Sequence, residues 1–457
     1  MTDLPNDITS LKALIQQLLE KNTQLEAENA ELRRRLGMDS HNSHKPPSSD
    51  GLNKKTTQPG LPKNKNRMNG GQPGHKGQTL KRVTHPDQVK VHRPQQCSCC
   101  GRLLGADEAH EIIQSRQVFD LPEPKLEVTE HRLAQIECCG QRQAGTYPLE
   151  VTAAVQYGPG VRALVTKLSI DHRMPLEQIS QLFEDLYGYD LNSATVEDAL
   201  ERAYDRAEPI ETHIVAQLSE AKLAHFDETG VRVAGKLHWL HGVSTETLTY
   251  LFVHEKRGTE ALNAKASVMK KFIGTAVHDC WSPYFSFTQA RHALCGAHLL
   301  RELQGLWDNG SLWAEEMHGL LLALYRLPRP LADDEQALLH YRLILDQADR
   351  EEPLPQRGTR GKPKQSKGRN LLNRLRRHEA GVLAFALEPD IPFTNNCAER
   401  DLRPAKVKQK VSGCFRTPLG ARVYARLQAV ISTGRKQGLN VFALLRDLFS
   451  YTPILLA

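Results

Sequence analysis

The sequence contains no apolar run long enough to cross a membrane. The longest run, at residues 319–325, is far short of the ~20 apolar residues that a spanning helix needs. The first turns of the chain contain Asp3, Asp7 and Lys12, where a targeting segment would be apolar. We therefore expect a cytoplasmic protein without a membrane partner.

The sequence also lacks the cysteine pattern of a disulfide-stabilised protein. Its nine cysteines are an odd number, and several of them are adjacent. Such a set suits reduced thiols or a metal site better than a disulfide framework. The 457 residues, of which 40% are hydrophobic, suffice for about three domains with substantial cores.

Three segments are rich in Lys and Arg and contain almost no acidic residues. Residues 41–96 contain eleven basic and two acidic residues, residues 353–377 contain nine and none, and residues 400–436 contain ten and one. Clustered positive charge neutralises phosphates and releases counterions. A single block is ordinarily solvated surface, but three blocks favour DNA or RNA binding. The candidate DNA contacts are Lys362, Lys364, Arg400, Arg403 and Lys406.

Residues 1–39 are predicted to form a leucine-zipper coiled coil. Apolar residues recur at heptad spacing, and Asn occupies two of the inner positions. Paired Asn side chains satisfy each other only in register, so the pattern favours a parallel dimer over a single amphipathic surface helix. The a positions are Ile8, Ile15, Asn22, Asn29 and Leu36, and the d positions are Leu11, Leu18, Leu25 and Leu32.

Two segments of different composition follow. Residues 40–90 are predicted to be a basic flexible linker, because a segment rich in Ser, Pro, Gly, Asn and Lys buries too little apolar surface to offset its ordering entropy. Residues 91–151 contain short alternating runs, such as residues 126–133, that predict strands. Cysteines at both ends of this segment indicate a small zinc-ribbon-like domain.

Four thiolates around one tetrahedral Zn²⁺ would staple such a domain. The predicted ligands are Cys97, Cys100, Cys138 and Cys139. The first two have the usual spacing of a zinc knuckle, whereas the last two are adjacent, which is unusual. Cys99 or His131 could therefore replace one of them, and ordinary reduced thiols are the alternative interpretation.

Residues 152–215 are predicted to form a helical DNA-binding domain. The stretch at residues 176–203 resembles a helix-turn-helix, with a turn at Gly188 and Ser193 as the cap of the second helix. Three packed helices that do not touch DNA would show the same pattern.

Residues 216–309 have the pattern of a mixed sheet with an acid on its first strand. An apolar run ends in Asp227 and a predicted turn at Gly230. Three antiparallel strands followed by alternating helices and strands is the order of a ribonuclease-H-like fold, in which the first and fourth strands are neighbours. Asp227 and Asp279 should then lie side by side. The later strands are predicted at residues 237–243, 248–253, 272–279 and 290–295, with a helix at 259–271.

Carboxylates at that position suit phosphodiester cleavage. Two Mg²⁺ ions ~3.5–4 Å apart can activate the attacking oxygen and steady the leaving oxygen, and carboxylates are their expected ligands. A third carboxylate should come from a helix packed on the sheet. Glu399 meets this requirement, because Asn395 or Asn396 can cap the helix that contains it. Taken singly, each acid is more often a surface or capping residue than a catalytic one.

Several longer motifs run from end to end of the chain. They are the leucine zipper, Asn-Ser-x-Lys-Pro-Pro-Ser-Ser-Asp at 42–50, Gly-Gly-Gln-Pro-Gly-His-Lys-Gly at 70–77, the cysteine groups, Asp227-Glu-Thr, His278-Asp279-Cys-Trp-Ser-Pro-Tyr, Cys295-Gly-Ala-His298, and Asn395-Asn396 with Ala398-Glu399-Arg400. In these motifs the chain resembles the transposases of the insertion sequence sixty-six family, which belong to the DDE superfamily.

The resemblance implies that Asp227, Asp279 and Glu399 are catalytic and bind two Mg²⁺ ions. Glu228 and Asp401 lie beside two of these acids and are the alternative assignments. The adjacent pair of cysteines in the predicted zinc ribbon departs from the family pattern and leaves the zinc ligands open.

The resemblance also implies how the rest of the core is divided. Residues 310–387 would be an all-helical insertion, and residues 388–457 the C-terminal part of the core with the Glu399 helix. Cys295 and His298 match a Cys-x-x-His motif of the superfamily. Two ligands do not close a zinc site, so we expect this pair to shape the core beside the acids.

The sequence thus predicts a multidomain protein of mixed α+β and α/β class. Its parts are a coiled coil, a zinc-ribbon-like domain, a helix-turn-helix-like domain and a ribonuclease-H-like core with a helical insertion. The predicted function is that of a bacterial insertion-sequence transposase at the nucleoid, which cleaves element ends and transfers the strands to target DNA. Its expected partners are those DNAs, a second copy of the chain and accessory proteins of the same element. The alternatives are a non-catalytic dimeric DNA-binding regulator or domesticated remnant, and a ribonuclease of the same fold.

Overall fold

The computed structural model describes most of the chain beyond residue 78. The described residues are 7–36, 42, 79–105, 107, 109–328, 330–331, 334–355, 365–450 and 452–454. The motif at 70–77, all of the motif at 42–50 except Asn42, and the candidate DNA contacts Lys362 and Lys364 lie outside them. Within the described residues, no helix combines the length and apolar character that a bilayer crossing requires.

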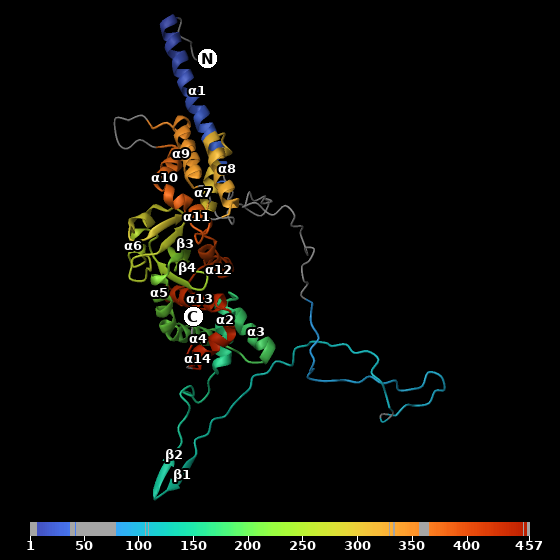
Figure 1. Ribbon diagram of the computed structural model, residues 1–457. Helices are drawn as coiled ribbons and strands as arrows, with labels where there is room; N and C mark the ends of the chain where they lie inside the picture. The colour runs from blue at the N-terminus through green and yellow to red at the C-terminus, as the bar shows by residue number, and fades with distance from the viewer. Residues whose placement is uncertain are drawn as a thin grey trace.

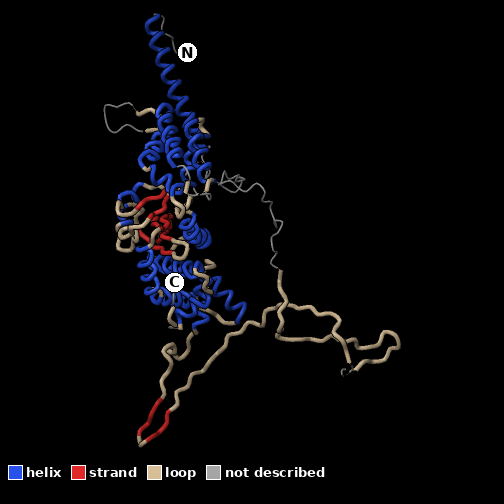
Figure 2. Tube along the Cα trace, in the orientation of Figure 1, coloured by secondary structure: helices blue, strands red, loops and turns tan. Residues whose placement is uncertain are grey.

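A five-stranded mixed sheet lies at the centre of the molecule, with helices at both of its ends (Figures 1 and 2). The strand order is β5-β4-β3-β6-β7. The first three strands pair antiparallel, whereas β6 and β7 are parallel to β3 and to each other. The strands are β3 (Leu223–Val233), β4 (Lys236–Ser244), β5 (Thr249–His254), β6 (Thr275–His278) and β7 (Arg291–Leu294).

The neighbouring positions of the first and fourth strands, β3 and β6, confirm the prediction from element order. Two local predictions were wrong. The turn predicted at Gly230 is absent, because β3 continues to Val233 and its register with β4 is unbroken. The turn predicted at Ala234-Gly-Lys236 is present, with φ angles of 48° at Ala234 and 77° at Gly235. The helix predicted at 259–271 is only α6 (Thr259–Leu262), followed by irregular turns.

Each face of the sheet has its own core. Val231, Leu240 and Leu251 pack with α12 (Asn396–Ser412) and α13 (Pro418–Lys436). On the opposite face, Phe226 and Val243 pack with α5 (Glu208–Glu220) and with the segment between α6 and β7, which contains the 3-10 helix η2 (Ser282–Ser286). Alternate residues of β3 therefore point toward α12 and toward α5, and this alternation decides which acids can meet.

A bundle of helices packs at the β7 edge, above the sheet in Figure 1. Its members are α7 (Gly296–Trp307), α8 (Leu312–Arg326), α9 (Asp334–Glu351), α10 (Lys367–Arg377) and α11 (Glu379–Leu387). Helices occupy the described part of residues 310–387, as predicted. Fully buried Trp313 and Tyr341 lie in their shared core, which also includes Leu294 of β7.

A second group of helices lies at the opposite end. It consists of α2 (Pro159–Ile170), α3 (Leu176–Tyr187), α4 (Ser193–Arg206), and α14 (Val441–Phe449) from the end of the chain. The predicted helix pair at 176–203 is present, with Gly188 ending α3 in the left-handed conformation at φ 69°. The cap of α4 is Asn192 rather than Ser193, because the Asn192 side chain accepts a hydrogen bond from the Ala194 amide.

The N-terminal segments contain less regular structure. Residues 8–36 form one helix, α1 (Ile8–Leu36), and its inward heptad residues Leu18, Leu25 and Leu32 are about half exposed. Between residues 79 and 152 the described elements are two short strands, β1 (Gln135–Cys138) and β2 (Gln141–Ala144), which form a hairpin away from the helices (Figure 2). The strand predicted at 126–133 is irregular instead, because no neighbouring chain pairs with it.

Candidate active site

Two acids lie side by side where β6 ends next to the middle of β3. The parallel register pairs His225 with Val277, so two residues further on Asp227 stands opposite Asp279. β7 continues the row, because His278 pairs with Leu294 and the next residue along β7 is Cys295. The row of Asp227, Asp279 and Cys295 therefore results from strand register alone.

Asp279 lies where the chain leaves β6. The next residue, Cys280, has a φ of 71°, a left-handed conformation that a non-glycine residue adopts at a cost of about 1–3 kcal/mol. This turn lets the Asp279 carboxylate accept a hydrogen bond from the Trp281 amide at 3.0 Å. The carboxylate is held by its own backbone and remains 18% exposed.

The third acid arrives on α12, which packs on the Asp227 face of the sheet. Glu399 lies in the first turn of this helix, where the helix dipole favours a negative charge. Gly242 pairs with Asp227 across β4, and a Cβ atom built on it would lie 3.2 Å from the Leu402 side chain. The missing side chain of Gly242 thus allows α12 to approach the strand that contains Asp227.

The pKa of Asp227 reflects both its burial and the acids around it. Burial raises the pKa of the Asp227 carboxyl well above its usual range, and the negative charges of Glu228, Asp279 and Glu399 raise this pKa further. Carboxylates that repel one another in a half-buried position are a donor set that a divalent cation would neutralise. The charge and chemistry of the three acids therefore fit Mg²⁺.

Glu228, the alternative to Asp227, points to the other face of β3. Its side chain is 1% exposed and accepts a hydrogen bond from Arg257 Nε at 2.7 Å. Tyr284 donates a second hydrogen bond through its hydroxyl at 2.7 Å. Both oxygens of Glu228 are therefore engaged by protein groups. Burial and the charge of Asp279 raise the pKa of Glu228, while Arg257 lowers it.

Arg257 links that pair to the candidate site. One of its Nη atoms lies 3.8 Å from Asp279 Oδ2. Its guanidinium carbon lies 4.1 Å from the centroid of the Trp281 ring and 5.0 Å from that of Trp239. Two aromatic faces thus position one cation beside both Glu228 and Asp279.

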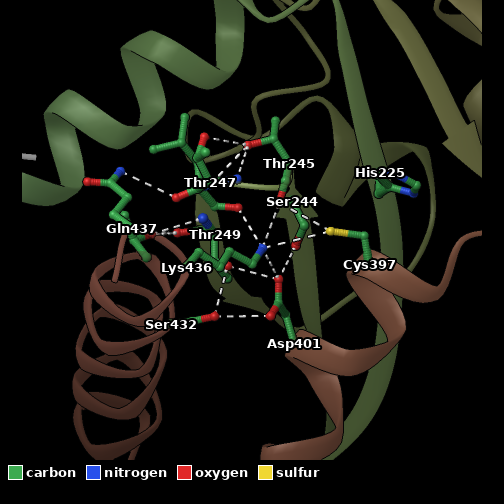
Figure 3. A network of polar contacts seen from close by, with 12 residues as sticks. His225, Ser244, Thr245, Thr247, Thr249, Cys397, Asp401, Ser432, Lys436 and Gln437 are labelled. Carbon is green, nitrogen blue, oxygen red and sulfur yellow. Dashed lines mark hydrogen bonds and ion pairs between the residues drawn. The ribbon is translucent and has the colours of Figure 1, made fainter. Parts of the chain in front are cut away.

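Asp401, the alternative to Glu399, is occupied by a polar network on the other side of α12 (Figure 3). Lys436 Nζ lies 2.7 Å from Asp401 Oδ2, and the Asp401 side chain is 10% exposed. Ser244 and Thr249 donate to the same oxygen, and Ser432 donates to Oδ1. Asp401 therefore anchors α12 to β4, β5 and α13.

Asn395 ties the start of α12 to the sheet. It occupies the N-cap position but makes no capping hydrogen bond with its side chain, contrary to the prediction. Its amide nitrogen donates to the Phe226 carbonyl at 2.8 Å, and its side-chain oxygen lies 2.9 Å from His225 Nδ1. Fully buried Asn395 thus connects β3, one residue before Asp227, to the helix that contains Glu399.

Cys295 and His298 lie next to Glu399 rather than apart from it. His298 Nδ1 is 3.9 Å from Glu399 Oε1. One ligand atom from each of Cys295, His298 and Glu399 lies within 4.8 Å of the others. Asp227, Asp279 and Glu399 do not form so tightly spaced a group within the described residues. Burial raises the pKa of the Cys295 thiol to about 11.

The remaining candidate residues are distributed over the surface. Arg400, Arg403 and Lys406 are exposed along α12, although Lys406 also donates to the Gly230 carbonyl at 2.5 Å. Cys97 and Cys100 lie in one turn, and Cys138 and Cys139 at the β1–β2 hairpin. The structure does not bring these four thiols together as a ligand group among the residues that it describes.

Part of the second basic block is neutralised within the helical bundle. Arg369 and Arg376 of α10 form ion pairs with Asp349, at 2.5 and 3.1 Å. Arg374 pairs with Glu302 of α7. These three arginines hold α10 against its neighbours and are not free to meet phosphate groups.

Sequence reasoning missed three residues that support the acids: Arg257, Asn395 as a bridge, and Lys436. Asn395 was within a recognised motif, but its sequence neighbours indicated a helix cap. Nothing near Arg257 or Lys436 distinguishes them from surface cations, because their partners are distant along the chain. The flanking residue Trp281 was part of the motif around Asp279 and was the one available signal.

Two family models match the chain. One, described as Transposase IS66 family, matches residues 154–423, more than half of the chain. That span includes the whole central sheet and all three acids. The other, described as a family of unknown function (DUF6444), matches residues 3–81. No curated protein matches the chain.

Proposed function

The chain belongs to the IS66 family of transposases, and we propose that it cleaves and joins DNA strands at Asp227, Asp279 and Glu399. The observation that carries this proposal is the register of β3 and β6, which sets two acids side by side on the sheet face that α12 covers. The strand order agrees with a ribonuclease-H-like core, which we propose for residues 216–309 and 388–457.

We propose that the three acids hold two Mg²⁺ ions. When bound, such ions supply Lewis-acid activation of the attacking oxygen and charge stabilisation at the leaving oxygen. The raised pKa of Asp227 supports this assignment, since its ionised form needs a nearby positive charge. Arg257 supplies such a charge to Asp279 from the opposite face, so the chain itself balances part of the negative charge.

The proposed reaction has two steps. In the first, the oxygen of a water molecule bonds to a phosphorus atom at the element end and a DNA 3′-hydroxyl is released. In the second, that 3′-oxygen bonds to a phosphorus atom of the target and the target's own 3′-oxygen leaves. No protein–DNA bond forms, so no Ser or Tyr nucleophile is required.

DNA would lie along the exposed side of α12. Arg400 and Arg403 are exposed on this helix, one and four residues after Glu399. A phosphate backbone that contacts them would pass beside the acids. Lys406 would contribute less, because its amino group already donates to Gly230 and burial lowers its pKa.

The remaining assignments complete the proposal. The exposed leucines of α1 support a parallel dimer that brings two element ends together. The α3–α4 pair would contact DNA, and Cys97, Cys100, Cys138 and Cys139 would bind a structural Zn²⁺. Accessory proteins of the same element would act with the dimer.

A plasmid assay tests the proposed function. The substrate is a supercoiled plasmid with the two element ends, which are taken from inverted repeats in the DNA that flanks the gene. We expect Mg²⁺-dependent nicking by the wild type that is lost in Asp227→Ala and Asp279→Ala, with Glu316→Ala, an exposed acid on α8, as the control. DNA retardation without any cleavage by the wild type would instead indicate a DNA-binding regulator, and cleavage restricted to RNA–DNA hybrids a ribonuclease.

A further inference from the structure

A thiol and an imidazole lie beside Glu399, and the proposed strand cleavage uses neither of them. Cys295 is the N-cap residue of α7, and His298 lies in the first turn of that helix. Their ligand atoms and a Glu399 oxygen all lie within 4.8 Å of one another. Within the described part of the chain, no other three His, Cys, Asp or Glu residues are spaced so closely.

Backbone contacts hold the two helices that contribute these ligands. The Asn395 amide, at the start of α12, donates to Cys295 Sγ at 3.2 Å. The Gly296 amide, at the start of α7, donates to the Phe393 carbonyl at 2.8 Å. The relative position of the two helix starts is therefore fixed by the main chain.

The ligand set selects a type of cation. Sulfur and imidazole nitrogen prefer Zn²⁺ and similar transition metals, whereas Mg²⁺ prefers oxygen. Around one tetrahedral Zn²⁺, such ligand atoms lie roughly 3.3–3.6 Å apart. The present group is wider, with all three ligand atoms within 4.8 Å of one another and His298 Nδ1 3.9 Å from Glu399 Oε1. A bound cation would draw the side chains of His298 and Glu399, which are 16% and 25% exposed, closer together.

We propose that Cys295, His298 and Glu399 form a binding site for a thiophilic divalent cation, with Zn²⁺ as the expected occupant. Three protein ligands leave a fourth position for water, which is the arrangement of an accessible rather than a closed zinc site. Cys295 and His298 alone supply two ligands, which do not close a zinc site, so their sequence pattern did not predict one. The structure adds Glu399, which is 101 residues beyond His298 in the chain.

The site has a consequence for the acids, and this consequence alone rests on the proposed function. Glu399 belongs to both ligand sets, so it cannot serve the Zn²⁺ site and the Mg²⁺ site fully at the same time. Zn²⁺ at Cys295 and His298 would draw the Glu399 carboxylate away from Asp227 and Asp279. Zn²⁺ is therefore expected to inhibit Mg²⁺-dependent cleavage.

Cobalt spectroscopy tests the site without any measurement of activity. Co²⁺ replaces Zn²⁺ in such sites and shows a near-ultraviolet charge-transfer band when a thiolate binds it. The full chain is used with the cysteines of the predicted zinc ribbon replaced by Ser, so that they give no signal. Those cysteines are Cys97, Cys99, Cys100, Cys138 and Cys139.

In that chain we expect a saturable charge-transfer band that reaches its maximum at one equivalent of Co²⁺ and disappears when Zn²⁺ is added. The band should be lost in Cys295→Ser. In His298→Gln, the intensity of the band at one equivalent of Co²⁺ should be at least tenfold lower. Cys397→Ser is the matched control, because Cys397 is also buried near Glu399 but donates to the Thr245 carbonyl. Absence of the band, or a band that survives Cys295→Ser, would overturn the proposal.

A second arm tests the competition. Cleavage is measured in Mg²⁺ with and without one equivalent of Zn²⁺ beyond the amount that fills the predicted zinc ribbon, and each variant is compared with itself. We expect Zn²⁺ to reduce wild-type cleavage at least tenfold and to have less than a twofold effect in Cys295→Ser. Equal inhibition of both would contradict the competition. If the wild type does not cleave at all, the proposed function fails while the cobalt titration still decides the metal site.

Discussion

Asp227 stands on the face of β3 that α12 covers, and the negative charges of Glu228, Asp279 and Glu399 act on its carboxyl group. Its pKa in the folded chain is raised above the usual 3.8. The stabilisation from the protonated form is present at low pH and is lost as the pH rises through the folded pKa. At neutral pH the ionised side chain therefore costs stability.

We predict that Asp227→Asn stabilises the metal-free protein at neutral pH, by on the order of 1–2 kcal/mol. Mg²⁺ should raise the Tm of the wild type but not that of the variant, because the amide removes both the charge and a ligand. Thermal unfolding in EDTA and in Mg²⁺ measures both effects, with exposed Asp190→Asn as the control. A Tm for Asp227→Asn in EDTA that is lower than the wild-type Tm would show that repulsion between the acids does not destabilise the folded protein.

At the residue scale, the neighbouring positions of Asp227 and Asp279 were predictable, whereas the residues that contact them were not. Asp227 and Asp279 each end an apolar run, a pattern that sequence shows directly. The pleat of β3 decides whether Asp227 or Glu228 faces α12. The identities of two adjacent acidic residues do not show which of them points to that face. Arg257 gave no signal, because its partners Glu228 and Trp281 are 29 and 24 residues away.

The position of α12 is set by contacts of two adjacent residues of the helix, Asp401 and Leu402. Toward the sheet, Leu402 packs on Gly242, the residue opposite Asp227. Toward α13, Asp401 pairs with Lys436. Glu399 is one turn or less from both contacts, so either one can move it relative to the other acids.

We predict that Gly242→Val displaces α12 and lowers the cleavage rate by about tenfold or more, because a 1 Å misplacement of a reacting group is costly. Gly242→Ala should have a smaller effect, since its Cβ would need the Leu402 side chain to yield by only a few tenths of an ångström. Rate measurements on a labelled element end compare these variants. Adding Leu402→Ala to Gly242→Val should restore part of the rate, and a rescue that fails would exclude this contact as the cause.

The buried ion pair gives a separate prediction. Asp401→Asn leaves the Lys436 ammonium, which is 15% exposed, without its counter-charge. We expect a loss of about 3–5 kcal/mol in the free energy of unfolding. The double variant Asp401→Asn/Lys436→Gln should be more stable than the single one. Urea unfolding of both variants decides the point, and additive losses would mean that the pair is not coupled.

At the scale of elements, strands were easier to predict than their ends. The alternation and apolar runs of β4, β5, β6 and β7 are local signals. The predicted break at Gly230 was wrong because β4 pairs with β3 without interruption from His225 to Val233 and holds Gly230 in an extended conformation. The prediction of a helix at 259–271 was wrong, because this segment forms turns after α6 and packs in an apolar core with η2.

Across the whole molecule, several histidines are buried without charge. Burial lowers the pKa of His278 and His225, and it lowers that of His241 to about 4. Unfolded histidine takes up a proton near 6.5. These groups therefore contribute stability that is complete above pH 6.5 and is lost as the pH falls toward their folded pKa values.

We predict that His241→Gln loses less stability on acidification than the wild type. Between pH 6.5 and 4 the difference between the two unfolding free energies should narrow by about 1.4 kcal/mol per pH unit. The two proteins are compared through the difference between their unfolding free energies. Asp227 and Glu228, whose pKa values are raised, change the stability of both proteins with pH in the opposite direction, and this effect cancels in the difference. Urea unfolding followed by tryptophan fluorescence provides the data, and parallel pH profiles would contradict the prediction.

The arrangement of the whole chain was the least predictable level. α13 and α14, from the end of the chain, pack against α2 and α4 in one shared core. We expected α2 and α4 in one domain and α13 and α14 in another, because no local sequence pattern shows which apolar helix faces pack together. The zipper pattern of α1, by contrast, is local, and its exposed leucines remain a prediction of dimer formation.

The central claim is that Asp227, Asp279 and Glu399 bind the ions that cleave DNA, and metal-specificity rescue at Asp279 tests it most directly. Single-turnover cleavage of a labelled element end is measured for Asp279→Cys, first in Mg²⁺ and then in thiophilic Mn²⁺. The account predicts a rate at least about 10²-fold below the wild type in Mg²⁺ and a substantial recovery in Mn²⁺. A wild-type rate for Asp279→Cys in Mg²⁺ would contradict it.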